Sequence, residues 1–307
     1  MNNFRNDILK VLAYFDMFHY PISEKEIILF LPNKSSRFSI SDQLHQLTLD
    51  RIIFRFGDFY TLHNDLQLMH KRLAGNKRAA ADLLTAYRIS KFLYRFPFIR
   101  AVSISGSLSK NFSDPKSDID YFIITSPGRL WIARTFLHLF KKLTFLSGVQ
   151  HHYCMNYFID EEALVIEEKN IFTAIETVTL LPICGNDTQE NFFSANRWTD
   201  HFLPNCRIVP KEKYYTGEKL RIKKVIESIL NNRLGAWMDD QFMKITSRRW
   251  ERKDRKCMVN MKGNRMGIIC RKHCCKPNPA YFQNEILMQY ERKIESLKYE
   301  FFAFNKP

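Results

Sequence analysis

The segment DIDYFIIT, residues 118–125, places two carboxylates one residue apart at the start of an apolar, β-branched and aromatic run. A run of this kind predicts a buried strand. Side chains alternate between the faces of a strand, so Asp118 and Asp120 point to one face and Ile119 to the other. Two carboxylates this close repel each other unless a cation neutralises them. The segment therefore predicts a strand that begins at a site for a hard divalent cation such as Mg²⁺.

A second apolar run, IRAVSIS at residues 99–105, ends at Gly106-Ser107, ten residues before the paired aspartates. It too predicts a buried strand. A glycine lets the backbone approach a phosphate closely, and the serine adds a hydroxyl and an N–H donor. Lys110 and Lys116 lie in the intervening loop, where we expect them to contact the same phosphates.

The pattern Gly-Ser-x10-Asp-Ile-Asp-Tyr resembles the signature of the polymerase-beta-like nucleotidyltransferase superfamily, in which a Gly-Gly or Gly-Ser turn precedes an Asp-x-Asp strand. The resemblance covers roughly residues 95–185. It implies that Gly106 and Ser107 position a nucleoside triphosphate such as ATP. Asp118 and Asp120 would then be the catalytic metal ligands, with two Mg²⁺ ions expected.

Members of the family usually carry a third carboxylate in a later strand, which completes the metal site and accepts the proton of the attacking hydroxyl. In this chain the aligned position, within MNYFID, is Asn156, which ligates a metal weakly and cannot act as a base. Asp160 follows four residues later, on the same face if the strand continues that far. We expect Asp160 to join the catalytic residues and Asn156 to act as a metal ligand, and the sequence leaves open which of them completes the site.

The resemblance implies a magnesium-dependent transferase. An acceptor hydroxyl or phosphate attacks the α-phosphorus of the nucleoside triphosphate in line, and pyrophosphate leaves. Positioning and metal electrostatics supply most of the acceleration in such reactions. The asparagine at position 156 also admits an alternative: a catalytically degenerate nucleotide-binding or regulatory protein that acts through its N-terminal unit.

Residues 1–63 predict three helices followed by a hairpin, an order that resembles a winged helix-turn-helix. Ser23-x-x-Glu26 is a capping-box pattern that opens the second helix, and Gly57-Asp58 predicts the turn of the hairpin. The third helix, residues 41–50, would be the recognition helix, but it carries no Lys or Arg to meet phosphate oxygens. Packing or partner binding is therefore preferred to DNA binding for this winged-helix-like domain.

The remainder of the chain divides into three parts. Residues 64–94 predict a linker helix, and residues 95–206 predict a nucleotidyltransferase domain with a mixed sheet and flanking helices. Residues 207–307 predict a basic helical C-terminal region, with amphipathic helices over 220–245 and 282–301. The expected fold class is α+β.

Most of the formal net charge of +15 falls near the C-terminus. Residues 248–276 carry eleven Lys or Arg against two acids, whereas residues 1–63 carry seven of each. A basic cluster attracts phosphates, so the segment predicts contact with nucleic acid or another anionic acceptor; a solvated loop is the open alternative. Four cysteines and His273 in this segment suit zinc, but they lack paired Cys-x-x-Cys knuckles, and reduced thiols are expected.

No apolar run approaches the roughly 18 residues that span a bilayer, and the stretch MNNFRNDILK lacks the pattern of a signal peptide. The seven cysteines form an odd and irregularly spaced set, unlike a secreted disulfide framework. We therefore expect a cytoplasmic protein with no membrane partner.

Overall fold

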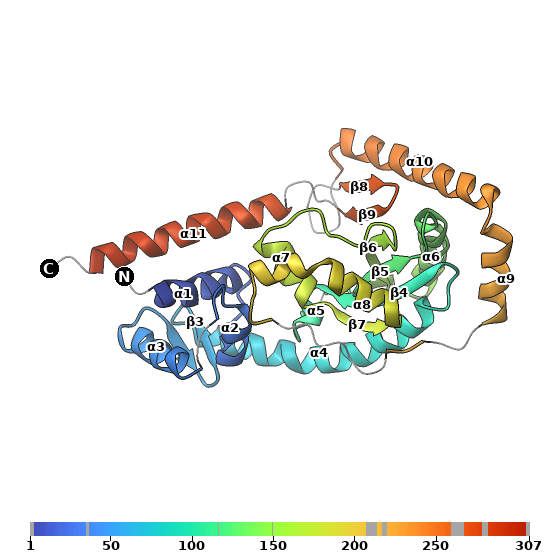
Figure 1. Ribbon diagram of the computed structural model, residues 1–307. Coiled ribbons are helices and arrows are strands. Elements are labelled where there is room, and N and C mark those ends of the chain that lie inside the picture. Colours follow the sequence, from blue (N-terminus) through green and yellow to red (C-terminus); the bar gives the residue numbers. More distant parts are fainter. Residues whose placement is uncertain are drawn as a thin grey trace.

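Figure 1 shows the protein as a computed structural model, which describes residues 3–34, 37–115, 117–148, 150–206, 214–216, 220–258, 267–277 and 282–304. Within these ranges the chain is an α+β protein with a small three-stranded sheet and a six-stranded mixed sheet. The expected fold class is confirmed at this level.

The N-terminal unit contains three helices and three short strands: α1 (Asn3–Asp16), β1 (Ile22–Ser23), α2 (Glu24–Phe30), α3 (Arg37–Leu49), β2 (Phe54–Phe56) and β3 (Phe59–Thr61). The strands pair antiparallel in the order β1-β3-β2. The predicted capping box is confirmed, because Ser23 accepts a hydrogen bond from the backbone of Glu26 and the Glu26 carboxylate accepts one from Ser23 N at 2.8 Å. The predicted order of three helices and a hairpin is thus present.

Helix α4 (Leu66–Leu93) joins this unit to the large sheet, and it is packed on both. Its Arg72 is buried, with the guanidinium carbon 3.6 Å from the centre of the Tyr20 ring and one nitrogen 2.7 Å from the Glu26 carboxylate. Burial lowers the pKa of Arg72 to about 9. The core of the unit also takes in Phe112 and Leu203, from far along the chain. The N-terminal unit is therefore built into the rest of the protein.

The large sheet has the order β7-β4-β5-β6-β9-β8. Its strands are β4 (Ile99–Ser105), β5 (Asp120–Thr125), β6 (Cys154–Asp160), β7 (Leu181–Cys184), β8 (Ile268–Arg271) and β9 (Cys274–Pro277). β5 and β6 are parallel, and every other neighbouring pair is antiparallel. β4 and β5 coincide with the two apolar runs on which the site was predicted.

Helices cover both faces of this sheet (Figure 1). Around it lie α5 (Gly106–Ser109), α6 (Leu130–Thr144), α7 (Ile171–Val178), α8 (Asn186–Ala195), α9 (Arg221–Leu230) and α10 (Arg233–Arg255), whereas α11 (Phe282–Phe304) packs on α1 of the N-terminal unit and on α7. One face packs Tyr121 and Ile123 of β5 in a core with side chains of α4 and α6. The other face packs Phe122 and Ile124 in a core with Phe192 of α8. The alternation predicted for the Asp-x-Asp strand thus separates two cores.

The C-terminal region is not purely helical, which corrects the expectation for residues 207–307: the hairpin β8–β9 extends the large sheet beside β6. The helix expected over 220–245 is also two helices. The first helix, α9, ends at Leu230, and Asn232 caps the start of α10, because its side chain accepts a hydrogen bond from Gly235 N at 3.0 Å. Gly235 allows the tight bend, since an added Cβ would lie 1.8 Å from Leu230 O.

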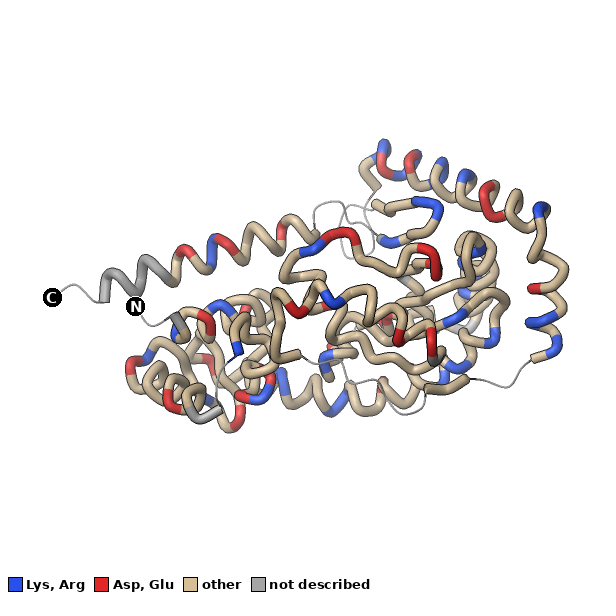
Figure 2. The backbone as a smooth tube through the Cα atoms, viewed as in Figure 1, with Lys and Arg blue, Asp and Glu red and all other residues tan. Residues whose placement is uncertain are grey.

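The basic segment 248–276 is divided between the end of α10 and this hairpin, with residues 259–266 outside the described ranges. Figure 2 shows lysines and arginines along both elements. The hairpin bases are engaged: Lys276 lies 2.7 Å from Glu168 and Lys272 lies 3.7 Å from Asp240, while Arg271 pairs with Glu167. The other bases of the segment that the structure describes lie on the last turns of α10 and at its C-cap.

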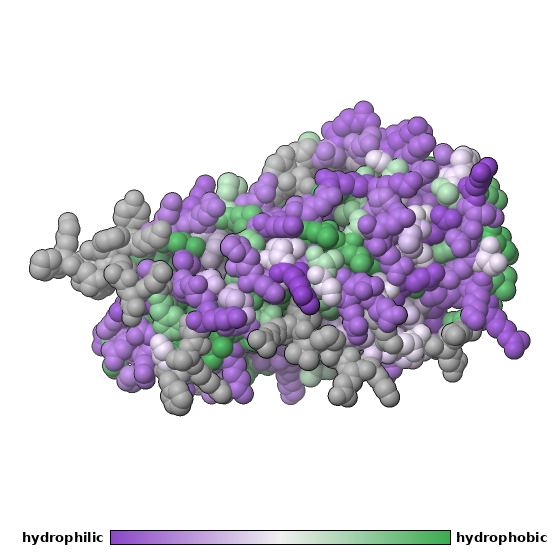
Figure 3. All heavy atoms as spheres, in the orientation of Figure 1, coloured by the Kyte–Doolittle hydropathy of each residue, from purple (hydrophilic) through white to green (hydrophobic). Residues whose placement is uncertain are grey.

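Helix α9 exposes an apolar stripe, with Ile222, Val225 and Ile229 at 72%, 56% and 61% exposure. Figure 3 shows hydrophobic atoms at the right-hand edge of the molecule, where Figure 1 places this helix. None of the helices in the described ranges has both the length and the apolar content needed to cross a membrane.

Candidate functional site

The site predicted from the sequence centres on the turn that ends β4. Gly106 has φ +71°, a left-handed conformation that favours glycine. A Cβ added to Gly106 would also lie 2.8 Å from Oδ2 of Asp120. Pairing of Ser105 with Asp120 in the sheet brings the two segments together. Glycine is thus required here for its conformation and for the closeness of the Asp120 carboxylate.

Both aspartates lie at this edge of the sheet and are half-buried. Asp120 is the first residue of β5, and its neighbour on β6 is Cys154. Burial raises the pKa of the Cys154 thiol to about 12, and the charges of Asp120 and Asp118 add to the rise. The Cys154 thiol thus lies within electrostatic reach of both carboxylates, and Asp118 lies two residues before the start of β5.

The loop between the Gly106 turn and Asp118 is fastened to α4 and to the N-terminal unit. Tyr20 donates a hydrogen bond to Lys110 O at 2.6 Å, and Arg78 donates one to Ser113 O at 2.9 Å. Phe112 lies over Gly75, where an added Cβ would meet its ring at 2.2 Å. These contacts hold the loop that carries the predicted phosphate ligands. Lys116, one of those ligands, lies outside the described residues.

Lys110 is engaged within the protein. Its ammonium group donates to Gly106 O at 3.1 Å and lies 2.7 Å from the carboxylate of Glu176 on α7. The ion pair ties α7 to the Gly106 turn. A phosphate at the turn would therefore compete with Glu176 for the predicted nucleotide ligand Lys110.

Asp160 lies elsewhere, which corrects its predicted role. In the parallel pairing of β5 and β6, Asp120 faces Cys154 and Thr125 faces Asp160. Five residues along a strand span roughly 16 Å at about 3.3 Å each, so Asp160 is at the opposite end of the sheet from Asp120. The four-residue spacing from Asn156 to Asp160 predicts which face of the strand Asp160 occupies, but it does not give the distance of Asp160 from Asp120 along the strand. Asn156 lies in β6 where its register with β5 shifts, and its side chain is outside the description.

Asp160 instead belongs to a second group, with Glu162 and His273. Their ligand atoms lie within 4.8 Å of one another, so this group can hold a metal ion. The Asp160 carboxylate is fully buried, accepts a hydrogen bond from Gly128 N at 3.0 Å and lies 2.8 Å from Nδ1 of His273. These contacts also fasten the turn of the β8–β9 hairpin to the end of β6. The described cysteines take no part in this group.

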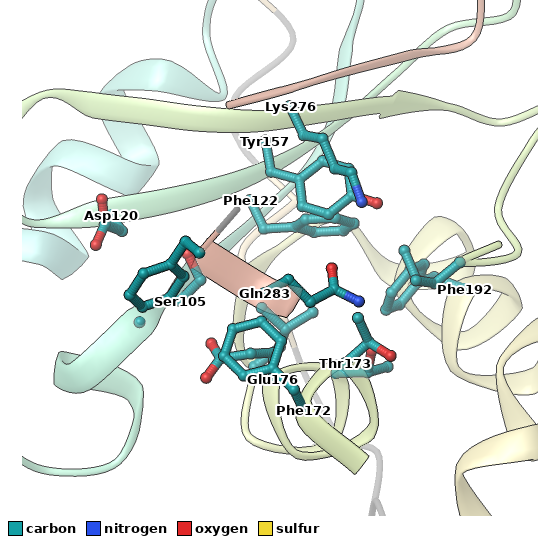
Figure 4. Close-up of a pocket in the computed structure, with 15 residues that line it drawn as sticks. Ser105, Asp120, Phe122, Tyr157, Phe172, Thr173, Glu176, Phe192, Lys276 and Gln283 are labelled. Carbon is teal, nitrogen blue, oxygen red and sulfur yellow. The ribbon is translucent and has the colours of Figure 1, made fainter. Parts of the chain in front are cut away.

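A cavity of about 270 Å³ begins at Asp120 and runs along the sheet face that carries Phe122 (Figure 4). Its walls come from β4, β5, β6, β9 and from α7, α8 and α11. Ser105 and Asp120 lie at one end of the view, Phe192 lies at the other, and Glu176 and Lys276 reach in from opposite sides. The predicted metal-binding edge thus opens directly into a small-molecule cavity.

Charge in this cavity is mostly compensated. Lys276 is the cationic side chain among its described lining residues, and it pairs with Glu168 at 2.7 Å. Burial alone would raise the pKa of Glu168. The hydrogen bond from Lys276 and the positive charge of Lys276 together outweigh burial, so the pKa of Glu168 lies below its usual value. Glu176 is the acid that shares the cavity with Asp120. Sequence reasoning did not identify Glu176, because no motif links its helix to the Asp-x-Asp strand.

Comparison of the chain with protein families, with curated proteins and with solved structures finds no match. The chemistry of the site therefore has to be inferred from its own groups. Two carboxylates beside a glycine turn offer hard oxygen ligands for a divalent cation and backbone groups for a phosphate. The adjoining cavity offers room for an organic group.

Proposed function

We propose that the protein is a magnesium-dependent nucleotidyltransferase that transfers a nucleoside monophosphate from a nucleoside triphosphate to an acceptor. The observation that carries this proposal is the Gly106 turn, which is packed against the Asp120 carboxylate with Asp118 two residues before it. The Gly-Ser turn and the Asp-x-Asp strand occupy adjacent antiparallel strands, as the resemblance to polymerase-beta-like nucleotidyltransferases requires.

The residues present suit Mg²⁺. Asp118 and Asp120 supply carboxylate oxygens, which are the ligands this ion prefers. Bound between these carboxylates and phosphate oxygens, Mg²⁺ would neutralise charge that builds up on the phosphates during transfer. The Cys154 thiol beside Asp120 is a soft ligand, so the hard Mg²⁺ ion would take the carboxylate oxygens in preference to it.

The chain's own groups would orient the reactants. The Ser107 hydroxyl and the backbone at Gly106 bind the terminal phosphates, and Lys110 turns from Glu176 towards them. Asp120 lies at the mouth of the cavity, where it directs the acceptor hydroxyl at the α-phosphorus. Glu176, released from Lys110, is a carboxylate in the same cavity that can accept the hydroxyl proton. This assigns to Glu176 the proton-accepting role that was predicted for Asp160.

A second candidate is a nucleotide-binding regulator without turnover. It is favoured by Cys154, which stands beside Asp120 on the strand where the family usually places its third carboxylate. In that case the N-terminal winged-helix-like unit would bind a partner, and its close packing on α4 would transmit nucleotide occupancy. Both candidates require a triphosphate at Gly106.

Isothermal titration calorimetry tests the proposal. ATP, GTP, CTP and UTP are titrated with and without Mg²⁺ into the wild-type protein, the Asp118→Asn/Asp120→Asn variant and the exposed control Asp58→Asn. We expect magnesium-dependent binding in the wild type and in Asp58→Asn, and its loss in the double variant. Triphosphate binding that does not depend on Mg²⁺, or that persists in the Asp118→Asn/Asp120→Asn variant, would refute the assignment. Product formation from a labelled triphosphate then separates the enzyme from the regulator.

A further inference from the structure

The cavity beside Asp120 is walled largely by aromatic rings. Phe122 lies at the centre of this wall, with its ring 5.0 Å from the rings of both Tyr157 and Phe192. Phe172 of α7 and Phe282 of α11 meet edge to face, with their ring centres 6.1 Å apart. Rings arranged in this way bind flat apolar groups by edge-to-face and offset contacts.

A triphosphate does not suit this cavity. The lining residues that the structure describes include two acids, Asp120 and Glu176, and a single cation, Lys276, which Glu168 already neutralises. Phosphates need cations or clustered N–H donors, and the proposed function assigns the phosphates to the Gly106-Ser107 turn. The cavity therefore receives an uncharged part of a reactant.

The order of groups across the sheet indicates which reactant this is. Gly106 ends β4, Asp120 begins β5, and the cavity continues beyond them to Tyr157 on β6 and Lys276 on β9. In an in-line displacement the attacking and leaving oxygens lie on opposite sides of phosphorus. With pyrophosphate held at the Gly106 turn, the attacking group approaches from the side of the cavity.

We propose that this cavity binds the acceptor, and that the acceptor is a small molecule with a hydroxyl group and a flat apolar group such as an aromatic ring. The proposal rests on the nucleotidyltransferase function proposed above. The hydroxyl lies at Asp120, and the apolar group lies among Phe122, Tyr157 and Phe192. An acceptor made only of polyol or amino groups leaves this aromatic wall without a partner.

The reaction balances as a phosphoryl transfer. The acceptor oxygen forms a bond to the α-phosphorus, and the bond from that phosphorus to the oxygen bridging to the β-phosphate breaks. Pyrophosphate leaves with the bonding electron pair. The hydroxyl proton passes to the Glu176 carboxylate and from there to solvent. The products are pyrophosphate and a nucleoside monophosphate ester of the acceptor.

Saturation-transfer NMR with 2-phenylethanol as the aromatic alcohol and ribitol as a polyol control tests this proposal. Phe282→Asp places a charge in the cavity wall at a residue that is 42% exposed, so folding should tolerate it. Gln283→Trp fills the cavity from the same helix. Met288→Asp is the matched control, because Met288 is 50% exposed on α11 and does not line the cavity.

We expect 2-phenylethanol to bind the wild type and Met288→Asp alike, to bind Phe282→Asp and Gln283→Trp at least about tenfold more weakly, and to outcompete ribitol. Mg²⁺ with α,β-methylene-ATP should leave its binding intact, because the two reactants occupy different places. Displacement by the nucleotide would assign the cavity to the nucleobase and overturn the proposal. Equal binding of ribitol, or no effect of the cavity variants, would overturn it too.

The same binding measurements distinguish failure of the acceptor proposal from failure of the nucleotidyltransferase proposal. If α,β-methylene-ATP binds and 2-phenylethanol does not, the acceptor assignment fails and the nucleotidyltransferase proposal stands. If α,β-methylene-ATP does not bind at any Mg²⁺ concentration, the proposed function fails and takes the acceptor role of the cavity with it.

Discussion

Replacement of Gly106 by alanine combines two separable effects. At φ +71° an alanine backbone is strained by about 1–2 kcal/mol. The new Cβ also lies 2.8 Å from Oδ2 of Asp120, so the carboxylate has to move. Gly128→Ala isolates the first effect, since Gly128 has φ +58° and nothing within 4 Å of an added Cβ.

Thermal unfolding and magnesium-dependent ATP titration of both variants separate the two effects. A loss of about 1–2 kcal/mol lowers Tm by about 1.5–3 °C in a chain of 307 residues, and we expect both variants to show it. Only Gly106→Ala should lose magnesium-dependent ATP binding, by about tenfold or more. If Gly106→Ala binds ATP as Gly128→Ala does, the position of the Asp120 carboxylate against the turn is irrelevant to the site, and the reasoning is refuted.

Three further substitutions test other parts of the account. Asp160→Ala should lower the free energy of unfolding in urea by about 1–3 kcal/mol, because Gly128 N loses the buried carboxylate to which it donates, while ATP binding stays intact. Weakened ATP binding would return Asp160 to the site. Burial raises the pKa of Asp239 to about 6, although hydrogen bonds from Ile132 N and Trp131 N oppose the rise. The folded state therefore holds the Asp239 proton more tightly than the unfolded state does. This contribution to the free energy of unfolding is full below about pH 4 and is lost as pH rises to about 6. Asp239→Asn should flatten this part of the plot of unfolding free energy against pH, and an unchanged slope would contradict the prediction. Asn232→Ala should cost about 1 kcal/mol in the same urea assay, since it removes the cap of α10, and a neutral effect would show that the bend does not need the cap.

The strands of the site could be predicted because their sequence signals are local. IRAVSIS and DYFIIT are apolar runs of strand length, and they form β4 and β5. The Ser23 capping box likewise needs four residues, and it is present. Local patterns of this kind specify an element whatever surrounds it.

Predictions that depended on position along an element were weaker. Asp160 has the right spacing from Asn156 for one strand face, but only the pairing of Cys154 with Asp120 reveals how far along the sheet it lies. The helix expected over 220–245 continued through Asn231 because its apolar spacing persists, whereas Asn232 caps a new helix. Spacing gives the face of an element and does not give its end.

The cavity and the hairpin could not be predicted from local patterns. The cavity brings Phe122, Glu176, Lys276 and Phe282 together from four separate elements. The hairpin β8–β9 has short strands that carry Arg271 and Lys276, whose charges hide a strand pattern. Arg271 and Lys276 form ion pairs with Glu167 and Glu168, so the hairpin contributes less unpaired positive charge than its composition suggests.

The most direct test of the central claim is a crystal structure of the protein with Mg²⁺ and α,β-methylene-ATP. We expect metal density at about 2.0–2.1 Å from oxygens of Asp118 and Asp120, with the triphosphate against Gly106 and Ser107. Metal bound at Asp160, Glu162 and His273 instead, with the Gly106 turn free of nucleotide, would contradict it.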